Sequence, residues 1–348
     1  MMIDWFTGKV PFFYEGVLSD GEVISIDASG AVEYSTVKRK VISGSYATNF
    51  TIRTTNVDSE GNTSEVQLSG NPVKFLQGHN VWGSDDLPNL VYETVLKISA
   101  ILGIEQPLHI LSKLKQGIGT VSRVDINEMY KLGSRSNVLA YLFHASQNFR
   151  TRAQSAVSKG STVYLNKESR RWSVKLYSKG QEVELPRNNK QGLIEFTPSV
   201  KNYCDDALRI ELTLKQSELN DIDLKNLVAW HNVEIDELFN KYFERLVMAD
   251  QLELQLIDLD KLSLGVRSTY QLWFTGHDVR NMVSKPTFYR HRKQLLEHGI
   301  DISMPSNNTQ PDRSNVVPLV RTITLTPATI PEWAKGTQLF FEPRKHIV

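Results

Sequence analysis

The stretch RRWSVKLYSK, residues 170–179, reads as a β-strand in which Leu176 lies between polar neighbours. On such a strand Tyr177 and Lys179 share one face, because successive side chains point to opposite sides. A lysine beside a phenol favours the phenolate form, and a phenolate is a nucleophile. The same residues equally fit an ordinary strand with an exposed salt bridge, since short motifs match by chance.

Further predicted strands and helices along the chain indicate an α+β fold. Strand-like runs occupy 116–130, 161–166 and 206–215, and two runs joined by turn residues predict a hairpin over 46–70. Apolar residues at helical spacing predict helices at 86–104 and 134–154. Helices placed between strand sets in this way predict a mainly antiparallel sheet.

The chain of 348 residues is longer than one domain usually is, so we expect two. The first, residues 1–216, holds the predicted sheet. After residue 216 the pattern becomes helical, and residues 223–253 read as an amphipathic helical segment. We therefore predict a second, mostly helical domain over residues 217–348.

Composition excludes several classes of protein. The single cysteine, Cys204, rules out an internal disulfide framework and a Cys-based zinc site, and it fits a reducing cytoplasm. There is no signal-peptide pattern and no apolar run of about 18 residues, so we expect no membrane span. The formal net charge is +1, so nucleic-acid binding would need a local basic surface.

A basic surface of this kind is predicted between residues 150 and 190, where basic residues far outnumber acidic ones. Tyr164 and Trp172 lie among them, and such a mixture suits a groove that neutralises phosphates and stacks bases. The arginines assigned to this surface are Arg150, Arg152, Arg170 and Arg171. A solvated charged face is the alternative.

The segment SKPTFYRHRKQLLEHGIDI, residues 284–302, predicts a short basic helix with Ser284 as N-cap and Gly299 as stop. The outer face is predicted to carry Arg290, His291, Arg292 and Lys293. Together with Lys285, the arginines and Lys293 are our candidates for DNA contacts. The helix fits the recognition helix of a helix-turn-helix, and it fits a surface helix of a helical subdomain equally well.

Carboxylates and one histidine stand near the ends of predicted strands. Asp125, Glu211 and His79 are candidate ligands of Mg²⁺ or Mn²⁺, with Glu182 as a substitute. Such an ion would polarise a phosphoryl group. Each residue also has a simpler explanation: Asp125 can pair with Arg123, Glu211 with the nearby Arg209, and His79 can cap a loop.

Several motifs together carry a resemblance to a known family. VKFLQGHNVWG, SRVDI, KLYSKGQE followed by ALRIELTL, and NVVPLVRTITLTPATIPEW occur in this order, with LQGHNVWG and NVVPLVR the most specific. They resemble the replication-initiation (gene II) proteins of filamentous bacteriophages, from the N-terminal MIDW to Trp333. This family is similar to plasmid rolling-circle initiators, which implies an HUH-like nuclease core. The His-hydrophobe-His triplet of those nucleases is missing, and His109 does not supply it.

The resemblance implies an activity. Such proteins bind the viral origin in replicative-form DNA, nick the plus strand through a phosphotyrosine, and later religate the displaced strand into a circle. At the matching positions Tyr177 is the nucleophile, and Lys179 is the cation that helps it ionise. Asp125, Glu211 and His79 are the metal ligands that we expect, with Mg²⁺ or Mn²⁺ as the ion.

The resemblance also implies partners and a location. Expected partners are double-stranded origin DNA, the single plus strand, and the host helicase, polymerase and single-strand-binding protein, in the host bacterial cytoplasm. A dimer or multimer on the origin is possible. The alternative function is a non-catalytic, sequence-specific DNA-binding regulator of replication or copy number, which would need neither Tyr177 nor the carboxylates.

Overall fold

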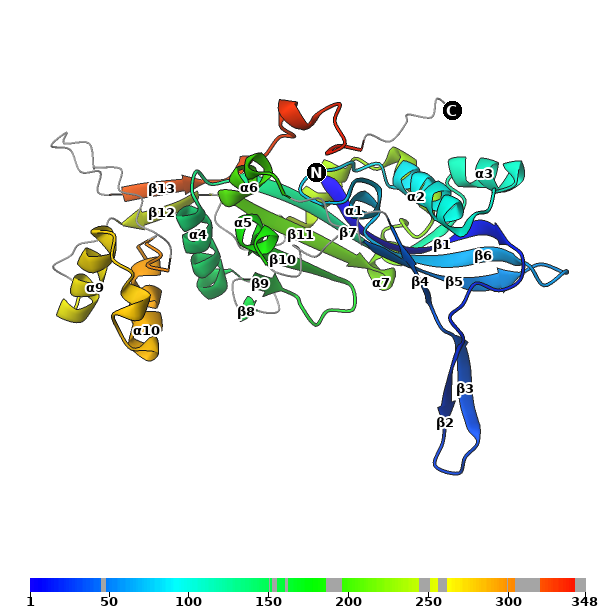
Figure 1. Cartoon of the computed structure of the whole chain (residues 1–348), viewed down its shortest axis with the longest axis horizontal. Coiled ribbons are helices and arrows are strands. Elements are labelled where there is room, and N and C mark those ends of the chain that lie inside the picture. The colour runs from blue at the N-terminus through cyan, green and yellow to red at the C-terminus, as the bar shows by residue number, and fades with distance from the viewer. Residues whose placement is uncertain are drawn as a thin grey trace.

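The structure is a computed structural model, and most of the chain lies in one long body with helices on a curved sheet (Figure 1). It describes residues 1–44, 48–149, 151, 155–159, 162–185, 196–243, 251–255, 262–298, 300–303 and 320–341. Arg150, Arg152 and Gly299 lie outside the described residues, as does most of the motif NVVPLVR.

The centre of the fold is one large antiparallel sheet with the strand order β4-β5-β6-β1-β7-β11-β10-β9-β8, and a short strand, β14, also pairs with β7. Its strands are β1 (Met2–Tyr14), β4 (Lys40–Ser43), β5 (Asn49–Val57), β6 (Thr63–Gly70), β7 (Thr120–Lys131), β8 (Val157–Lys159), β9 (Thr162–Leu165), β10 (Trp172–Ser178), β11 (Ala207–Lys215) and β14 (Thr326–Pro327). The predicted α+β fold with a mainly antiparallel sheet is confirmed. The predicted hairpin is β5–β6.

The two faces of the sheet differ in polarity because the strand side chains alternate. On β11, Leu208, Ile210 and Leu212 join the main hydrophobic core, while Arg209 and Glu211 lie on the opposite face. All five are buried, so β11 is covered on both sides. Charged side chains in a buried central strand are costly to desolvate, and they mark the polar face as the place to look for function.

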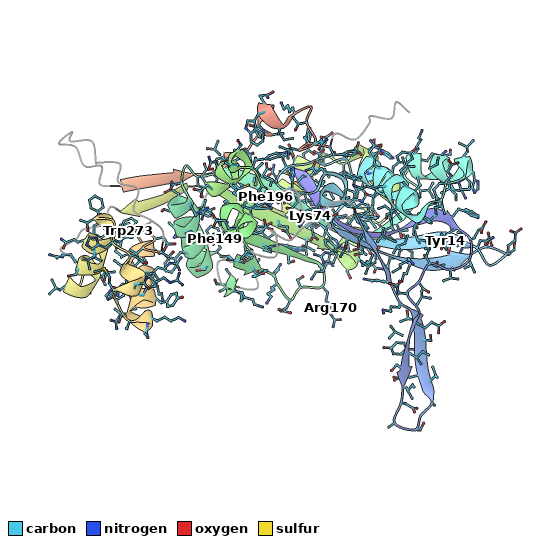
Figure 2. The ribbon with its side chains drawn as sticks, in the orientation of Figure 1. Tyr14, Lys74, Phe149, Arg170, Phe196 and Trp273 are labelled. Atoms are coloured by element: carbon cyan, nitrogen blue, oxygen red, sulfur yellow. The ribbon has the colours of Figure 1, made fainter. Side chains whose placement is uncertain are left out.

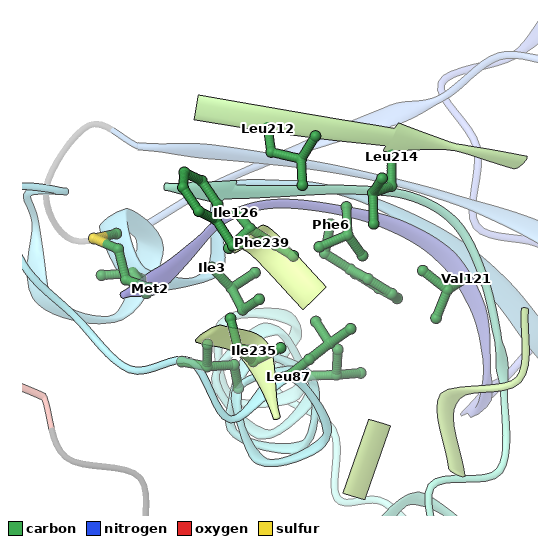
Figure 3. Close-up of a cluster of buried hydrophobic side chains, with 14 of the residues drawn as sticks. Met2, Ile3, Phe6, Leu87, Val121, Ile126, Leu212, Leu214, Ile235 and Phe239 are labelled. Atoms are coloured by element: carbon green, nitrogen blue, oxygen red, sulfur yellow. The ribbon is translucent and has the colours of Figure 1, made fainter. Parts of the chain in front are cut away.

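Helices cover the apolar face. Figure 3 shows side chains from helices α2 (Leu87–Leu102) and α8 (Ile235–Phe243) packed against Ile3, Ile126 and Leu212 of three neighbouring strands. Asp86 caps the start of α2, and Gly103 ends it in the left-handed conformation. Both residues are the start and stop signals that the sequence carries there.

Further helices connect the strands. They are α1 (Pro72–Gln77), α3 (Leu108–Lys115), α4 (Arg135–Asn148), α5 (Lys179–Val183), α6 (Pro198–Asp205), α7 (Gln216–Asp221) and the 3₁₀ turn η2 (Leu227–Asn232). Helices α7 and α8 and turn η2 pack into the main core, although they follow residue 216. The predicted boundary at 216–217 stays a prediction, and side chains from both sides of it share one core.

The later residues form a small helical module with its own core. Helix α9 (Leu264–Phe274), the 3₁₀ turn η4 (Val279–Asn281) and helix α10 (Lys285–Leu296) surround Val266, Phe288 and Leu295. The connection between α9 and α10 is longer than the three- or four-residue turn of a typical helix-turn-helix. Strands β12 (Gln251–Gln255) and β13 (Val320–Thr324) pair beside this module.

Three local predictions were wrong. Residues 251–253 belong to strand β12 and not to the predicted helical segment, because Val320–Thr324 pairs with them. Thr151 is not helical, although the predicted helix over 134–154 includes it, because α4 ends at Asn148 and Phe149 is extended. Lys179 begins helix α5 instead of ending the strand, because the Ser178 hydroxyl accepts a hydrogen bond from the Gln181 amide and caps a helix there.

Two features complete the outline. Strands β2 (Glu22–Ile26) and β3 (Val32–Val37) form a ribbon that projects from the sheet (Figure 1), and residues 326–341 return to the main sheet after the helical module. We call residues 326–341 the C-terminal strap; it contains the 3₁₀ turn η5 (Glu332–Ala334). Among the described helices, none has the length and apolarity needed to span a bilayer.

Candidate active site

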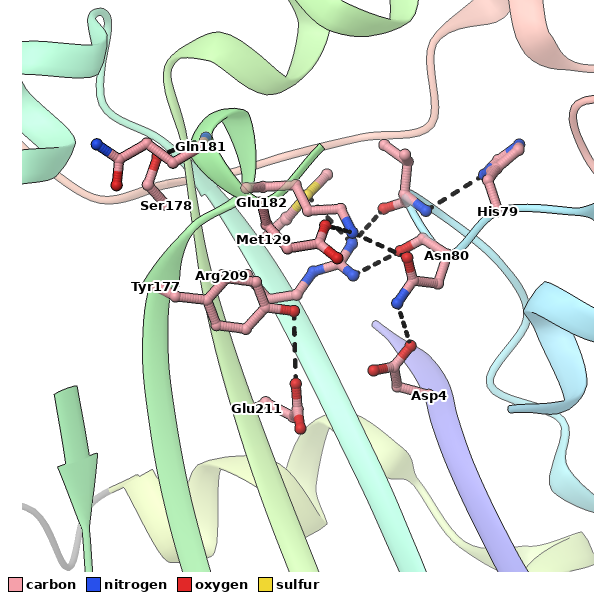
Figure 4. Close-up of polar contacts among 12 residues, drawn as sticks. Asp4, His79, Asn80, Met129, Tyr177, Ser178, Gln181, Glu182, Arg209 and Glu211 are labelled. Atoms are coloured by element: carbon pink, nitrogen blue, oxygen red, sulfur yellow. Dashed lines mark hydrogen bonds and ion pairs between the residues drawn. The ribbon is translucent and has the colours of Figure 1, made fainter. Parts of the chain in front are cut away.

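The polar face of the sheet holds Tyr177 next to Glu211. The Tyr177 hydroxyl donates to Glu211 Oε2 at 3.5 Å, and both residues line a cleft of about 630 Å³ (Figure 4). The pair register explains the contact: Tyr177 on β10 lies opposite Arg209 on β11, and Glu211 is two residues further along the same face. Burial raises the pKa of Tyr177 well above its usual value, so the free phenol is neutral.

The lysine that touches the tyrosine ring is Lys175. Its Nζ lies 4.6 Å from the centroid of the Tyr177 ring and donates to Glu211 Oε2 at 2.8 Å. Lys179 lies elsewhere: it is fully buried, and its Nζ donates to Asn80 Oδ1 at 2.8 Å and Glu182 Oε2 at 2.7 Å. The opening motif therefore contributes its tyrosine to the cleft and uses its lysine to hold Glu182 and Asn80.

A buried arginine clamps the loop over the sheet. Arg209 donates from one terminal nitrogen to the carbonyl of Asn80 and from the other to the carbonyl of Val81, both at 2.5 Å. The side chain is completely buried. The pairing of Arg209 with Glu211, considered as the simpler explanation, is absent from the described contacts. Arg209 instead fixes the loop of residues 78–83, which lies within the motif LQGHNVWG, residues 76–83.

That loop orients an acidic residue that the sequence analysis did not single out. Asn80 and Asn71 each donate an amide hydrogen to Asp4 Oδ1, at 2.8 and 2.7 Å. A register shift between Ile3 and Trp5 on β1 sets Asp4 and Trp5 opposite the single residue Asp125. This bulge lets Ile3 and Phe6, which are three residues apart, both lie in the core while Asp4 faces the cleft. The sequence did carry a signal for this residue, because Asp4 is an acidic residue within the otherwise apolar N-terminal stretch MMIDWF.

Three carboxyls thus share the polar face: Asp4, Asp125 and Glu211. Arg123 neutralises Asp125 through two hydrogen bonds of 2.8 and 2.6 Å, which confirms the simple pairing considered for these two. Burial raises the pKa of Glu211 to about 7, opposed by Lys175 and reinforced by the negative charges of Asp4 and Asp125. A carboxyl with this pKa is suited to exchange a proton near neutral pH.

The raised pKa of Glu211 makes stability depend on pH. The folded protein holds this proton up to about pH 7, whereas the unfolded chain releases it near the ordinary glutamate pKa of 4.5. The stabilisation is therefore complete below about pH 4.5 and is lost as the pH rises through 7. We expect up to about 3 kcal/mol of unfolding free energy to disappear over this window. Urea titrations at closely spaced pH values measure it.

Glu211→Gln is the matched variant for this measurement. The amide keeps the shape and the acceptor for Lys175 but cannot ionise, so the slope between pH 4.5 and 7 should flatten. An equally steep slope in Glu211→Gln would assign the effect to another carboxyl, such as Asp125, whose pKa burial also raises.

His79 is not placed with the carboxyls. Its Nε2 bonds to the carbonyl of Leu339 at 2.8 Å, and its Nδ1 accepts from the Val81 amide at 3.2 Å. Burial lowers the pKa of His79 to about 4, so the ring is neutral and Nε2 carries the donated hydrogen. His79 thus caps the 78–83 loop, as the simpler explanation held, and ties it to the C-terminal strap.

The predicted ligand set of Asp125, Glu211 and His79 is accordingly not brought together. Across the described ranges, no three His, Cys, Asp or Glu side chains form a group that could hold a metal. The chemistry of the cleft still fits a hard cation. Glu182 and Glu184 in its wall are paired with Lys179 and Arg135. Glu211 is paired with Lys175, and Asp4 has no ion pair among the described residues. A phosphate entering the cleft would meet uncompensated negative charge.

The predicted DNA-contacting residues fall into two groups. Lys285, Arg290 and Lys293 are exposed on α10, and Arg170 is exposed on the loop before β10, where Figure 2 shows its side chain projecting from the body. Arg171 instead pairs with Glu218 and Asp221.

Two α10 residues are turned inward, contrary to the predicted outer face. Arg292 forms two hydrogen bonds to the buried Asp301, at 2.6 and 2.7 Å. His291 is buried, with its Nδ1 2.8 Å from the Thr269 hydroxyl. Both residues tie α10 to neighbouring parts of its module, and the helical turn that exposes Arg290 necessarily buries His291.

An antiparallel sheet with a buried tyrosine, a carboxyl partner and a separate basic helix is compatible with a protein that acts on DNA. Comparison narrows the class to phage replication-associated proteins. The family model for the N-terminal region of these replication-associated proteins matches residues 2–234, and the model for their C-terminal region matches residues 254–339. The replication-associated protein of Enterobacteria phage I2-2 is 36% identical over 339 residues, covering 95% of both chains.

This chain therefore belongs to the family of phage replication-associated proteins. The predicted resemblance to the phage replication-initiation proteins is confirmed. The two matched regions are in contact in the structure. The C-terminal strap lies mostly in the C-terminal matched region, and it hydrogen-bonds to Gln77, His79 and Trp82 of the N-terminal matched region.

Proposed function

We propose that this protein initiates rolling-circle replication of phage DNA by nicking the plus strand at the origin and remaining attached to its 5′ end. Tyr177 is the nucleophile in this proposal. The observation that carries it is the hydrogen bond from the Tyr177 hydroxyl to Glu211 in an open cleft, within a chain of the phage replication-associated family. The reaction takes place in the host cytoplasm, where host helicase, polymerase and single-strand-binding protein would continue replication.

The chemistry follows from the neighbours of Tyr177. As the phenol oxygen attacks the scissile phosphorus, its proton passes to Glu211, the carboxyl that accepts the hydrogen bond of the phenol. The bond from phosphorus to the 3′ oxygen breaks, and that oxygen leaves as the 3′ hydroxyl after taking a proton from water. The 5′ phosphate stays on Tyr177, so the bond can later be transferred to another 3′ hydroxyl. This reverse step closes the displaced strand into a circle.

Lys175 and Lys179 have different parts in this scheme. Lys175, beside both the ring and Glu211, is the cation placed to stabilise negative charge on the phenol oxygen and on the phosphate. Lys179 orients Asn80, and Asn80 in turn orients Asp4. We therefore transfer to Lys175 the assisting role that the sequence had led us to expect of Lys179.

Mg²⁺ or Mn²⁺ would be held by Asp4 and Glu211, with the charge of Asp125 behind them. Such an ion supplies positive charge for a bound phosphate. In the absence of the ion, the ammonium group of Lys175 supplies positive charge beside Glu211, and Asn71 and Asn80 keep Asp4 in position. His79 is not a ligand in this proposal, because both of its ring nitrogens already have partners.

Metal binding should stabilise the folded protein. At about a hundredfold excess over its dissociation constant, Mn²⁺ is expected to add about 2.7 kcal/mol, or roughly 4 °C in melting temperature at pH 8. Thermal unfolding followed by circular dichroism measures the shift. Glu211→Gln should lose it, whereas Glu184→Gln, a cleft carboxyl already paired with Arg135, should keep it. The same shift in all three proteins would place the ion elsewhere.

The exposed basic face of α10 is proposed to contact duplex origin DNA. Replacing Arg290 and Lys293 together by alanine should weaken binding and reduce the slope of log K against log salt by about two, because two phosphate contacts are lost. Filter binding over a range of salt concentrations measures both. Arg292→Ala is the contrasting variant: leaving Asp301 unpaired should cost about 2–3 kcal/mol of stability with an unchanged salt slope. An unchanged slope in the double variant would reject α10 as the DNA contact.

The test of the function itself is a covalent adduct. Uniformly labelled supercoiled origin DNA and Mg²⁺ or Mn²⁺ are mixed with the protein. The 5′ end formed at the nick should carry its label with the protein on a denaturing gel.

A further inference from the structure

A second cavity opens on the same polar face of the sheet. Its volume is about 500 Å³, and its walls come from β1, β7, the 78–83 loop, α6 and the C-terminal strap. The apolar side chains Trp82, Tyr203, Met2 and Met129 line it, together with the charged Glu128, Glu332 and Lys335. Residues of the strap close one side, where the Tyr203 hydroxyl donates to the carbonyl of Thr329 at 2.7 Å.

One polar side chain in this cavity lacks its partner. Asn127 lines the cavity and is only 1% exposed, and its amide nitrogen donates to no acceptor among the described residues. A buried donor left unpaired costs free energy, so such groups are rare unless something else supplies the acceptor.

The cavity lies close to the proposed nucleophile. Asn127 on β7 is the register partner of Glu211 on β11, and β10 with Tyr177 is the next strand along. Two strand spacings, together with the two-residue offset of Tyr177 from Lys175, which lies opposite Glu211, amount to about 12 Å. Since phosphates in a stacked strand follow one another at about 3.4 Å, this distance corresponds to about three nucleotides or fewer.

We propose that this cavity binds one unstacked base of the single DNA strand, within about three nucleotides of the cleaved phosphate. The base would lie between the aromatic and methionine side chains, and one of its ring carbonyls or ring nitrogens would accept the hydrogen bond that Asn127 has free. The inference rests on the proposed function, because it needs a single strand to cross this face of the sheet. It adds a site that would hold the base at one position of the strand.

The test is a binding scan with Tyr177→Phe protein, which cannot cleave. The probe is a labelled single strand of the phage origin in which each nucleotide around the mapped nick is replaced in turn by an abasic one. One position should stand out, with affinity lowered roughly tenfold. A flat scan would overturn the proposal even if wild-type protein forms the covalent adduct, and a single sensitive position without any adduct would keep this site and reject the nicking function.

Asn127→Leu, made in the same Tyr177→Phe protein, links the position to the cavity. Leucine has a similar size and removes the unpaired donor, so folding stability should be maintained or improved. Binding to the intact strand should fall several-fold, and the abasic substitution at the sensitive position should then have an effect of less than about twofold. Asn56→Leu, at an exposed asparagine of β5, should leave the scan as it is. A full tenfold abasic effect in the Asn127→Leu protein would place the base elsewhere.

Discussion

Tyr177→Phe is expected to form no covalent adduct and to nick origin DNA at least roughly 10⁴-fold more slowly than the wild type. The reason is that phenylalanine fills the same space but has no oxygen to attack phosphorus. Since the hydroxyl makes only a long hydrogen bond of 3.5 Å to Glu211, its removal should change stability little. The measurement is single-turnover cleavage of supercoiled DNA, with the adduct resolved on a denaturing gel.

Tyr164→Phe is the matched control, because Tyr164 lines the same cleft on the neighbouring strand β9. It should retain both adduct and nicking. Nicking that survives in Tyr177→Phe would point to another tyrosine or to a metal-activated water. If wild-type protein binds the origin tightly but never nicks it, the non-catalytic regulator becomes the better description.

Arg209→Met is expected to cost about 3 kcal/mol of unfolding free energy or more. The variant leaves the carbonyls of Asn80 and Val81 without their donor in a buried place, and each such group costs about 1–3 kcal/mol. Loosening this loop also releases Asn80 from Asp4, so metal binding should weaken as well. Urea unfolding followed by fluorescence measures the first effect.

The control for this loss is Arg39→Met, at an exposed arginine whose contact with Gln67 is 3.4 Å long. Its cost should stay below about 1 kcal/mol. Equal costs for the two variants would mean that the loop is held mainly by its other contacts, among them His79 with Leu339 and Val81.

The start of helix α5 shows how a local signal can be overlooked. Alternation alone extends the strand to Lys179, whereas Ser178 and Gln181 form the serine-x-x-glutamine pattern of a helix start. Reading that pattern would have ended the strand at Ser178. It would also have left Lys175, two residues before Tyr177, as the lysine on the tyrosine face. This correction was available from the sequence without any tertiary information.

Local order was determined by the sequence. Alternating side chains placed strands β7, β10 and β11, and the caps at Asp86 and Ser284 placed the starts of α2 and α10, because these signals act between residues close in the chain. The ordered motifs also identified the family, and Tyr177 was the residue of the cleft that they indicated.

Only the tertiary structure decided which charged groups meet. Asp4 lines the same cleft as Glu211, next to a bulge on β1, and Arg209 bonds to a loop more than a hundred residues away instead of to its near neighbour Glu211. The cavity at Asn127 is closed by a strap from the other end of the chain. Alternation tells which face a side chain occupies, but strand order, register and loop docking decide its neighbours, and these depend on the packing of the whole chain.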